Sequence, residues 1–256
     1  MKTTLLLVTL AAVAAPLAAQ DFKWSGALAS GKSLEIRGIN GSVRAVPASG
    51  TTALVTATKR ARRSDPDEVE IKVVEHAGGV TICAVYPSRR SGRPNECRAD
   101  GRGNNETRDN DVEVAFEVQV PAGVRFEGNT VNGDITAENL KGEVDVGTVN
   151  GDIELSTTGW AEANTVNGSI TARLGRGDWN GDLEFTTVNG SIEVALPAGL
   201  GADLEASTVN GTIDSDFTIT TRGRLNRRSI EGRIGDGGRK LELSTVNGGI
   251  RIRQAS

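Results

Sequence analysis

The chain has 256 residues, of which 37% are hydrophobic and 4% aromatic, enough for one or two domains with a modest core, and this argues against intrinsic disorder. The formal net charge is -4, so the chain lacks the basic character expected of a nucleic-acid-binding protein.

The N-terminus has the form of a secretory signal. Lys2 precedes an apolar run from Leu5 to Val13 and small residues up to Ala19, which predicts a signal peptide over residues 1–19. No later apolar run approaches the roughly 20 residues that a membrane-spanning helix needs. We therefore expect an exported protein, periplasmic or at the cell surface, with no transmembrane segment in the mature chain.

Residues 20–120 are predicted to form an N-terminal β region that is continuous with the repeats after it. Gly38-Ile39-Asn40-Gly41 already has the form of the later repeat corners. Alternating β-branched residues then predict longer strands over residues 53–58, 69–74, 80–85 and 112–120. Residues 89–111, rich in Arg, Gly and Asn, indicate a surface loop.

Cys83 and Cys97 are the only cysteines. An oxidising compartment would let them form a disulfide across the polar segment between them. The alternative is two separate thiols, with Cys83 buried in a strand. Because His76 is the only histidine and there is no second cysteine pair, neither a metal site nor a cofactor is predicted.

From residue 121 the sequence repeats. Thr-Val-Asn-Gly occurs six times, and isoleucine follows two residues after each glycine, with a second glycine between them in the last copy. Ser229-Ile230-Glu231-Gly232 reads as a further, degenerate copy. A period of 16–22 residues indicates a stacked repeat. The six copies begin at Thr130, Thr148, Thr165, Thr187, Thr208 and Thr245.

Each repeat holds two short alternating segments, which predicts two strands per coil, each with one apolar face. The predicted fold class is therefore all-β: a flattened parallel β-solenoid over residues 121–256, with longer strands in the N-terminal half. An antiparallel meander is the alternative, because Asn-Gly between alternating strands is also a hairpin signal. Recurrence once every two strands favours the solenoid.

The Asn-Gly pairs are predicted to be structural corners, where glycine and asparagine tolerate positive φ. The isoleucines after the corners and the valines or Ile230 within them are predicted to form two inward columns. The asparagines could stack as a hydrogen-bonded ladder, interrupted at Glu231, or serve corner geometry alone. The corner residues are Asn132, Gly133, Asn150, Gly151, Asn167, Gly168, Asn189, Gly190, Asn210, Gly211, Asn247 and Gly248.

Insertions of variable length are predicted on the edge opposite the corners, at residues 175–181, 197–201, 220–228 and 235–239. In solenoids such an edge is often the binding face. Its cations would suit an anionic glycan, a lipid head group or an acidic envelope protein, unless they only solubilise the loops. The candidate residues are Arg173, Arg176, Arg222, Arg224, Arg227, Arg228, Arg233, Arg239 and Lys240.

No catalytic residues are predicted. The carboxylates alternate along strands, as a solvated face does, and no pair is singled out for acid–base chemistry. A Ser-His-Asp triad could use only His76, and no Gly-x-Ser-x-Gly motif is present.

The spaced Thr-Val-Asn-Gly-Asp-Ile segments, the earlier Gly38-Ile39-Asn40-Gly41 and the Val-Pro-Ala-Gly lead-in at Val120 resemble the bacterial putative-adhesin family of unknown function, related to the head domain of putative autotransporter adhesins. The resemblance is strongest from Val112 to Arg253 and implies a β-solenoid exported to the cell envelope, without catalytic residues. The leading hypothesis is a non-enzymatic adhesion or interaction module. A structural or regulatory envelope scaffold is the alternative, and a glycan-acting enzyme is third.

Overall fold

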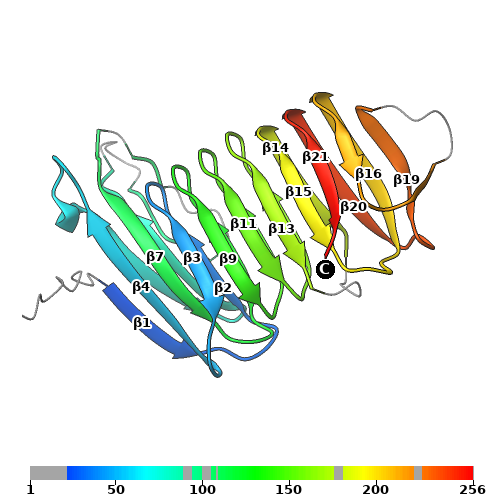
Figure 1. Cartoon of the computed structure of the whole chain (residues 1–256). Coiled ribbons are helices and arrows are strands. Elements are labelled where there is room, and N and C mark those ends of the chain that lie inside the picture. The colour runs from blue at the N-terminus through cyan, green and yellow to red at the C-terminus, as the bar shows by residue number, and fades with distance from the viewer. Residues whose placement is uncertain are drawn as a thin grey trace, which may run out of the picture.

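The computed structural model describes residues 22–88, 94–99, 105–107, 109–175, 181–221 and 227–255. The predicted signal peptide and much of the predicted loop over residues 89–111 lie outside the described residues. Within the described ranges the only helical element is the single turn η1 (Pro66–Glu68), and none of their helices could span a membrane. The rest of the regular structure is β-strand, arranged in two sheets that face each other along one axis (Figure 1).

Sheet A contains, among the described residues, ten strands. Their spatial order is β1 (Phe22–Ala27), β4 (Thr52–Arg60), β7 (Glu113–Val120), β3 (Val43–Pro47), β9 (Ile135–Leu140), β11 (Ile153–Thr157), β13 (Ile170–Leu174), β15 (Ile192–Leu196), β21 (Ile250–Gln254) and β17 (Ile213–Ser215).

Sheet B contains eleven strands in the same described part of the chain. Their spatial order is β18 (Ile219–Thr221), β19 (Ser229–Ile234), β16 (Ala202–Asn210), β20 (Arg239–Asn247), β14 (Leu183–Asn189), β12 (Ala161–Asn164), β10 (Val144–Gly147), β8 (Arg125–Asn129), β2 (Ser33–Arg37), β6 (Gly79–Val85) and β5 (Glu70–His76).

Successive coils pair in parallel and in register. On sheet A, Ile153 of β11 lies opposite Ile170 of β13, and on sheet B, Val144 of β10 lies opposite Ala161 of β12. Each coil therefore places one strand in each sheet, and equivalent positions of successive repeats meet across the coil boundary. This is the predicted parallel β-solenoid, and the meander is not formed. The coil β2–β3 stacks directly on β8–β9, so both sheets run from the N-terminal region into the repeats.

The spatial order of the last coils differs from their order in the sequence. The chain builds β16 and β17 at the far end, turns through β18 and β19, and returns to place β20–β21 between them and β14–β15. In Figure 1 the red β21 accordingly lies beside the yellow β15. The final Thr-Val-Asn-Gly copy thus forms an internal coil.

The degenerate copy at Ser229 is not a coil, so that prediction was wrong. Its residues form β19, which runs antiparallel to β16 and pairs Ile234 with Ala202. β18 is antiparallel to β19 in turn, while β4 and β5 close the N-terminal end in antiparallel pairings. Edge strands present unpaired backbone groups. The antiparallel strands separate the repeat coils from both ends of sheet B and from the N-terminal end of sheet A, whereas at the other end of sheet A the repeat strand β17 is itself the edge.

The core is a narrow layer between the sheets. The predicted isoleucine column is present: Ile135, Ile153, Ile170, Ile192 and Ile250 are almost completely buried. Val43 extends the column at one end, opposite Ile135, and the half-buried Ile213 ends it opposite Ile250. The alternating apolar residues of the sheet B strands, such as Leu183 and Phe185, are also buried and form the other side of the core.

Candidate functional site

The corner edge is the edge of the stack formed by the Asn-Gly turns, and a ladder of asparagine side chains runs along it. Each Nδ2 except that of Asn40 at the N-terminal end donates to the Oδ1 of an asparagine one coil away, at N···O distances of 2.7–2.9 Å. Glu231 lies on β19 and does not interrupt it. The ladder order is Asn40, Asn132, Asn150, Asn167, Asn189, Asn247 and Asn210.

None of these asparagines has a positive φ, so the ladder, rather than corner conformation, accounts for asparagine at this position. For glycine, the predicted reason, a positive φ, holds only at the first two corners. Positive φ occurs at Gly41 and Gly133 but at none of the later corner glycines. A Cβ added at Gly168 would instead lie 1.9 Å from the carbonyl oxygen of Gly151 in the next coil. The corners are glycine because the coils touch there.

The threonine of each corner repeat is buried and fixes its coil to the next. The Oγ1 of Thr148, for example, donates to the carbonyl oxygen of Gly133 at 3.0 Å. The other five threonines make the same bond to a corner glycine at 2.8–3.1 Å. Thr, Asn and Gly of the repeat are therefore all used in stacking the coils.

The corner valines point outward, so the second predicted inward column was wrong for them. Five are 38–40% exposed and Val209 is 55% exposed, whereas Ile39, the equivalent residue of the first coil, is buried. The coils are spaced by about 4.8 Å, so the valines form a straight row on the corner edge, which we call the valine stripe. In spatial order it consists of Val131, Val149, Val166, Val188, Val246 and Val209.

The cationic residues predicted to form one binding edge do not all lie together in the part of the chain that the structure describes. Arg176, Arg222 and Arg224 lie outside the described residues. Arg227 and Arg228 lie at the corner edge, because the backbone N–H of Thr208 donates to Arg228 O and that of Ile213 to Arg227 O. The predicted placement on the opposite edge was therefore wrong for Arg227 and Arg228, and residues 222–226 lie outside the described residues.

The remaining described members of that set are partly neutralised by carboxylates. Arg173 pairs with Glu154 at 3.0 Å, and Arg233 approaches Asp203 at 3.6 Å. Lys240 bridges Glu205 and Glu242 at 3.0 and 2.7 Å, and these hydrogen bonds raise its pKa. Arg239 is exposed at the start of β20.

The outer face of sheet B carries a row of carboxylates that pattern reasoning missed. Register places one acidic residue of each neighbouring strand directly opposite the next, which could not be deduced before the strand order was known. The row is Glu35, Glu127, Asp145, Glu162, Glu184, Glu242, Glu205 and Glu231. On sheet A the equivalent row is mixed, with Arg44 and Arg251 among its members.

Arg125 partly compensates the row, reaching Glu127 and Asp145 at 3.3 and 2.8 Å and lying 5.1 Å from the ring centroid of Trp160. Burial raises the pKa of Glu127 despite Arg125. Burial, with the neighbouring Asp145, also raises the pKa of Glu162. Like charges opposite one another in a sheet are destabilising, so this face is not optimised for stability.

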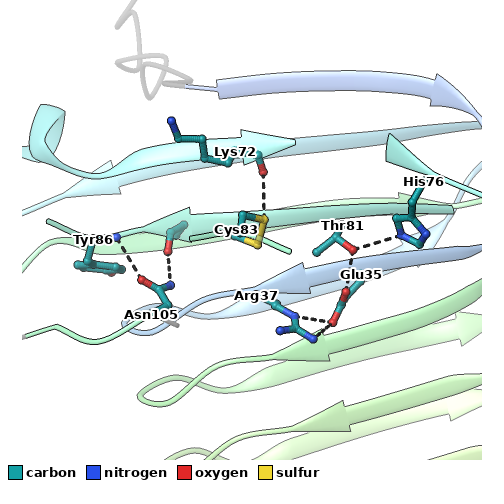
Figure 2. Close-up of a disulfide and its surroundings, with 10 residues drawn as sticks. Glu35, Arg37, Lys72, His76, Thr81, Cys83, Tyr86 and Asn105 are labelled. Atoms are coloured by element: carbon teal, nitrogen blue, oxygen red, sulfur yellow. Dashed lines mark hydrogen bonds and ion pairs between the residues drawn. A yellow bond between two sulfur atoms is a disulfide. The ribbon is translucent and has the colours of Figure 1, made fainter. Parts of the chain in front are cut away.

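The N-terminal end of sheet B contains a buried polar cluster, which Figure 2 shows beside the disulfide. The Thr81 hydroxyl donates to Glu35 at 2.8 Å and lies 3.3 Å from Nε2 of His76, while Arg37 pairs with Glu35 from the solvent side. Thr81 is completely buried. These contacts satisfy every member of the cluster and leave no hydroxyl open to a substrate.

Cys83 and Cys97, the pair expected from the sequence, are joined in a disulfide with a Cα–Cα distance of 5.7 Å. It attaches residues 94–99 to β6. Nearby, the Asn105 side chain donates to Ala84 O at 2.6 Å and accepts from the N–H of Tyr86. Tyr86 is buried, which raises its pKa to about 12, and its hydroxyl donates to Val112 O. The disulfide and these bonds are therefore structural.

Among the described residues, no three His, Cys, Asp or Glu side chains are grouped so as to hold a metal ion. A cluster of three arginines that was not predicted as a site lies at the end of β4. Arg60, Arg62 and Arg63 line an open hollow of about 860 Å³ at the N-terminal end of the corner edge, together with Asp111 and Glu113. The sequence signal was the run of four cations in residues 59–63.

Comparison with solved structures supports the architecture. The chain is similar to a putative cell adhesion protein from Clostridium sporogenes, with 12% identity and a TM-score of 0.50, over 91% of this chain and 99% of that one. A putative adhesin from Bacteroides fragilis is 8% identical over 92% of this chain and 98% of that one, with a TM-score of 0.32. At such identities the first likeness establishes the fold alone, and the second carries no argument.

No curated protein matches the chain. Its sequence from residue 104 to residue 253, more than half of its length, matches the family described as Toastrack DUF4097. The matched region contains every Thr-Val-Asn-Gly corner and the strands that stack behind them. The protein is therefore a member of the Toastrack DUF4097 family.

Proposed function

We propose that this protein is a non-catalytic, exported interaction module of the cell envelope, and that it contacts its partner through the corner edge. The observation that carries the proposal is the valine stripe. Six β-branched side chains stand in line and 38–55% exposed, although neither the corner turn nor the core needs them outside. Contiguous exposed apolar surface commonly marks a protein interaction site.

Two further facts support an adhesion-type role. The Clostridium neighbour of this fold bears the description of a cell adhesion protein. Arg227 and Arg228 adjoin the C-terminal end of the stripe, where their charge favours an anionic partner such as an envelope glycan, a lipid head group or an acidic protein. Of the arginines predicted to bind a partner, we keep that role for Arg227 and Arg228, which lie at the corner edge.

The proposal is tested by retention of the mature chain, residues 20–256, on immobilised bacterial cell envelopes. A variant with Val149→Thr, Val166→Thr and Val188→Thr keeps the side-chain shape and β-propensity but makes the stripe polar. We expect wild-type protein to be retained and this variant to be retained at least tenfold less. A control with Thr136→Ser, Ser156→Thr and Thr171→Ser alters the outer face of sheet A and should match wild type. Equal retention of all three proteins would refute the corner edge as the contact surface.

A further inference from the structure

The hollow at the N-terminal end of the corner edge is built around the end of β4. Lys59 is drawn inward, where its Nζ contacts Asp67 at 3.4 Å and Val69 O at 3.3 Å. Ala61 packs against the core. The residues that flank Ala61, Arg60 and Arg62, are both exposed. Two guanidinium groups two positions apart are thereby presented to solvent from one short segment.

The segment is held by Asp111 and not by its own arginines. The Asp111 carboxylate accepts from the backbone N–H of Ser64 at 2.8 Å and of Arg63 at 3.2 Å. The Ser64 hydroxyl accepts in return from the Asp111 N–H at 3.1 Å. The bonds to Ser64, chiefly, lower the pKa of Asp111 to about 2. Asp111 is therefore ionised at neutral pH, with its oxygens used by backbone donors, and the turn that carries the arginines is fixed in advance.

The remaining carboxylate of the hollow does not neutralise the arginines. Glu113 lies opposite Arg60 in the β4–β7 register. In the described part of the chain, however, neither Arg60 nor Arg62 forms an ion pair. Arg63 only approaches Asp111, at 3.7 Å from its Nε. Three arginines thus line one open hollow of about 860 Å³, and Arg60 and Arg62 form no ion pair with a described residue.

We propose that this hollow binds a tetrahedral oxyanion, the phosphate or sulfate ester group of a larger ligand. A guanidinium presents paired N–H donors that match two oxygens of such a group. Arg60 and Arg62 would donate to it from one side, and Arg63 would complete the charge. The hollow is far larger than the ion, which leaves room for the molecule that carries the ester. The site does not depend on the valine stripe or on the proposed function.

The test is titration of the mature chain with inorganic phosphate and with sulfate at constant ionic strength, followed by NMR of the arginine Nε–Hε groups. We expect saturable shifts at Arg60 and Arg62. The double variant Arg60→Gln, Arg62→Gln should weaken binding at least tenfold, and Arg251→Gln, an exposed arginine on sheet A, should leave it unchanged. Shifts that do not saturate, or equal affinity in wild type and the double variant, would overturn the site.

The carrier of the ester is identified by two further probes. Sedimentation with vesicles containing phosphatidic acid, but no retention on heparin, would assign a lipid phosphate, and the reverse result a sulfated glycan. Binding of the inorganic ions with binding to neither probe would overturn the ester assignment. The variant with threonine at positions 149, 166 and 188 should bind phosphate as wild type does, so failure of the proposed function and failure of this site are distinguishable.

Discussion

The valine and the isoleucine of one corner repeat face different environments, solvent and core, although they lie four positions apart in the sequence. In a straight strand, residues four apart lie on the same face, which is why both were expected inside. The sharp turn at Asn-Gly lies between them and breaks that parity. Val188 is consequently 38% exposed and Ile192 completely buried. This difference of environment is the most direct residue-scale test of the fold.

We expect Ile192→Ala to lower the free energy of unfolding by about 2–5 kcal/mol, because it leaves a cavity in a close-packed column. Val188→Ala, which removes a half-exposed side chain of similar type, should cost less than about 1 kcal/mol. Urea denaturation of the two variants measures both values. Similar losses in the two proteins would contradict the assigned facing of the corner.

Gly168→Ala should be strongly destabilising, since its Cβ would lie 1.9 Å from a backbone oxygen of the adjacent coil and neither backbone can move without its neighbours. Overpacking of this kind costs about 1–3 kcal/mol or more. Gly50→Ala is the matched control, because its Cβ would meet nothing within 4 Å. Thermal unfolding should show a clear fall in Tm for the first variant and little change for the second. A tolerated Gly168→Ala would mean that the coils are not in contact there.

At the scale of the strands, the two outer faces differ in electrostatics. The row on sheet B is continuously acidic, whereas the equivalent row on sheet A mixes acidic, basic and neutral side chains. Raised carboxylate pKa values in the folded state mean that the folded protein binds protons more tightly there than the unfolded chain does. Their stabilising effect is full at low pH and is lost as pH rises through the folded-state pKa.

We therefore expect the part of the stability due to Glu127 and Glu162, whose pKa values are raised, to increase as pH falls from 7 towards 5. Asp111 acts in the opposite direction. Its pKa is lowered from 3.8 to about 2, so its contribution is lost as pH falls below about 4.

Glu162→Gln should raise the free energy of unfolding at pH 7 by about 0.5 kcal/mol, because it removes a like charge from the row, and should flatten the pH dependence between 5 and 7. Glu154→Gln, on sheet A beside Arg173, should give no such gain. Urea denaturation midpoints of the wild type and both variants, measured between pH 5 and 7, test this prediction. A destabilised Glu162→Gln with an unchanged pH profile would show that the row does not strain the sheet.

At the scale of the whole molecule, the last two strands of the chain, β20 and β21, lie inside the stack and connect its end to the other coils. Truncation after Gly238 removes β20 and β21, which lie inside the stack. Because β16 and β17 have no other parallel partner than these strands in the described structure, we expect β16–β19 to lose hydrogen-exchange protection. Strands β9–β13 should keep it. Continued protection of β16 in the truncated protein would contradict the coil order.

The sequence determined the repeat, the two-strand coil and the inward isoleucines, since these follow from local periodicity. It offered the asparagine ladder as one of two interpretations, with an interruption at Glu231 that the structure does not show. It also indicated the cysteine pair. None of these inferences requires knowledge of which coil lies next to which.

Only the tertiary structure decided the features that depend on neighbours distant in the sequence. The outward valines follow from the shape of the corner turn, and the acidic row and the dispersal of the arginine set follow from strand order. The hollow at Arg60 exists because Asp111, 47 residues from Ser64 in the chain, fixes its loop. Side chains far apart in sequence meet through backbone pairing, and the internal position of the last coil shows that sequence order does not dictate that pairing.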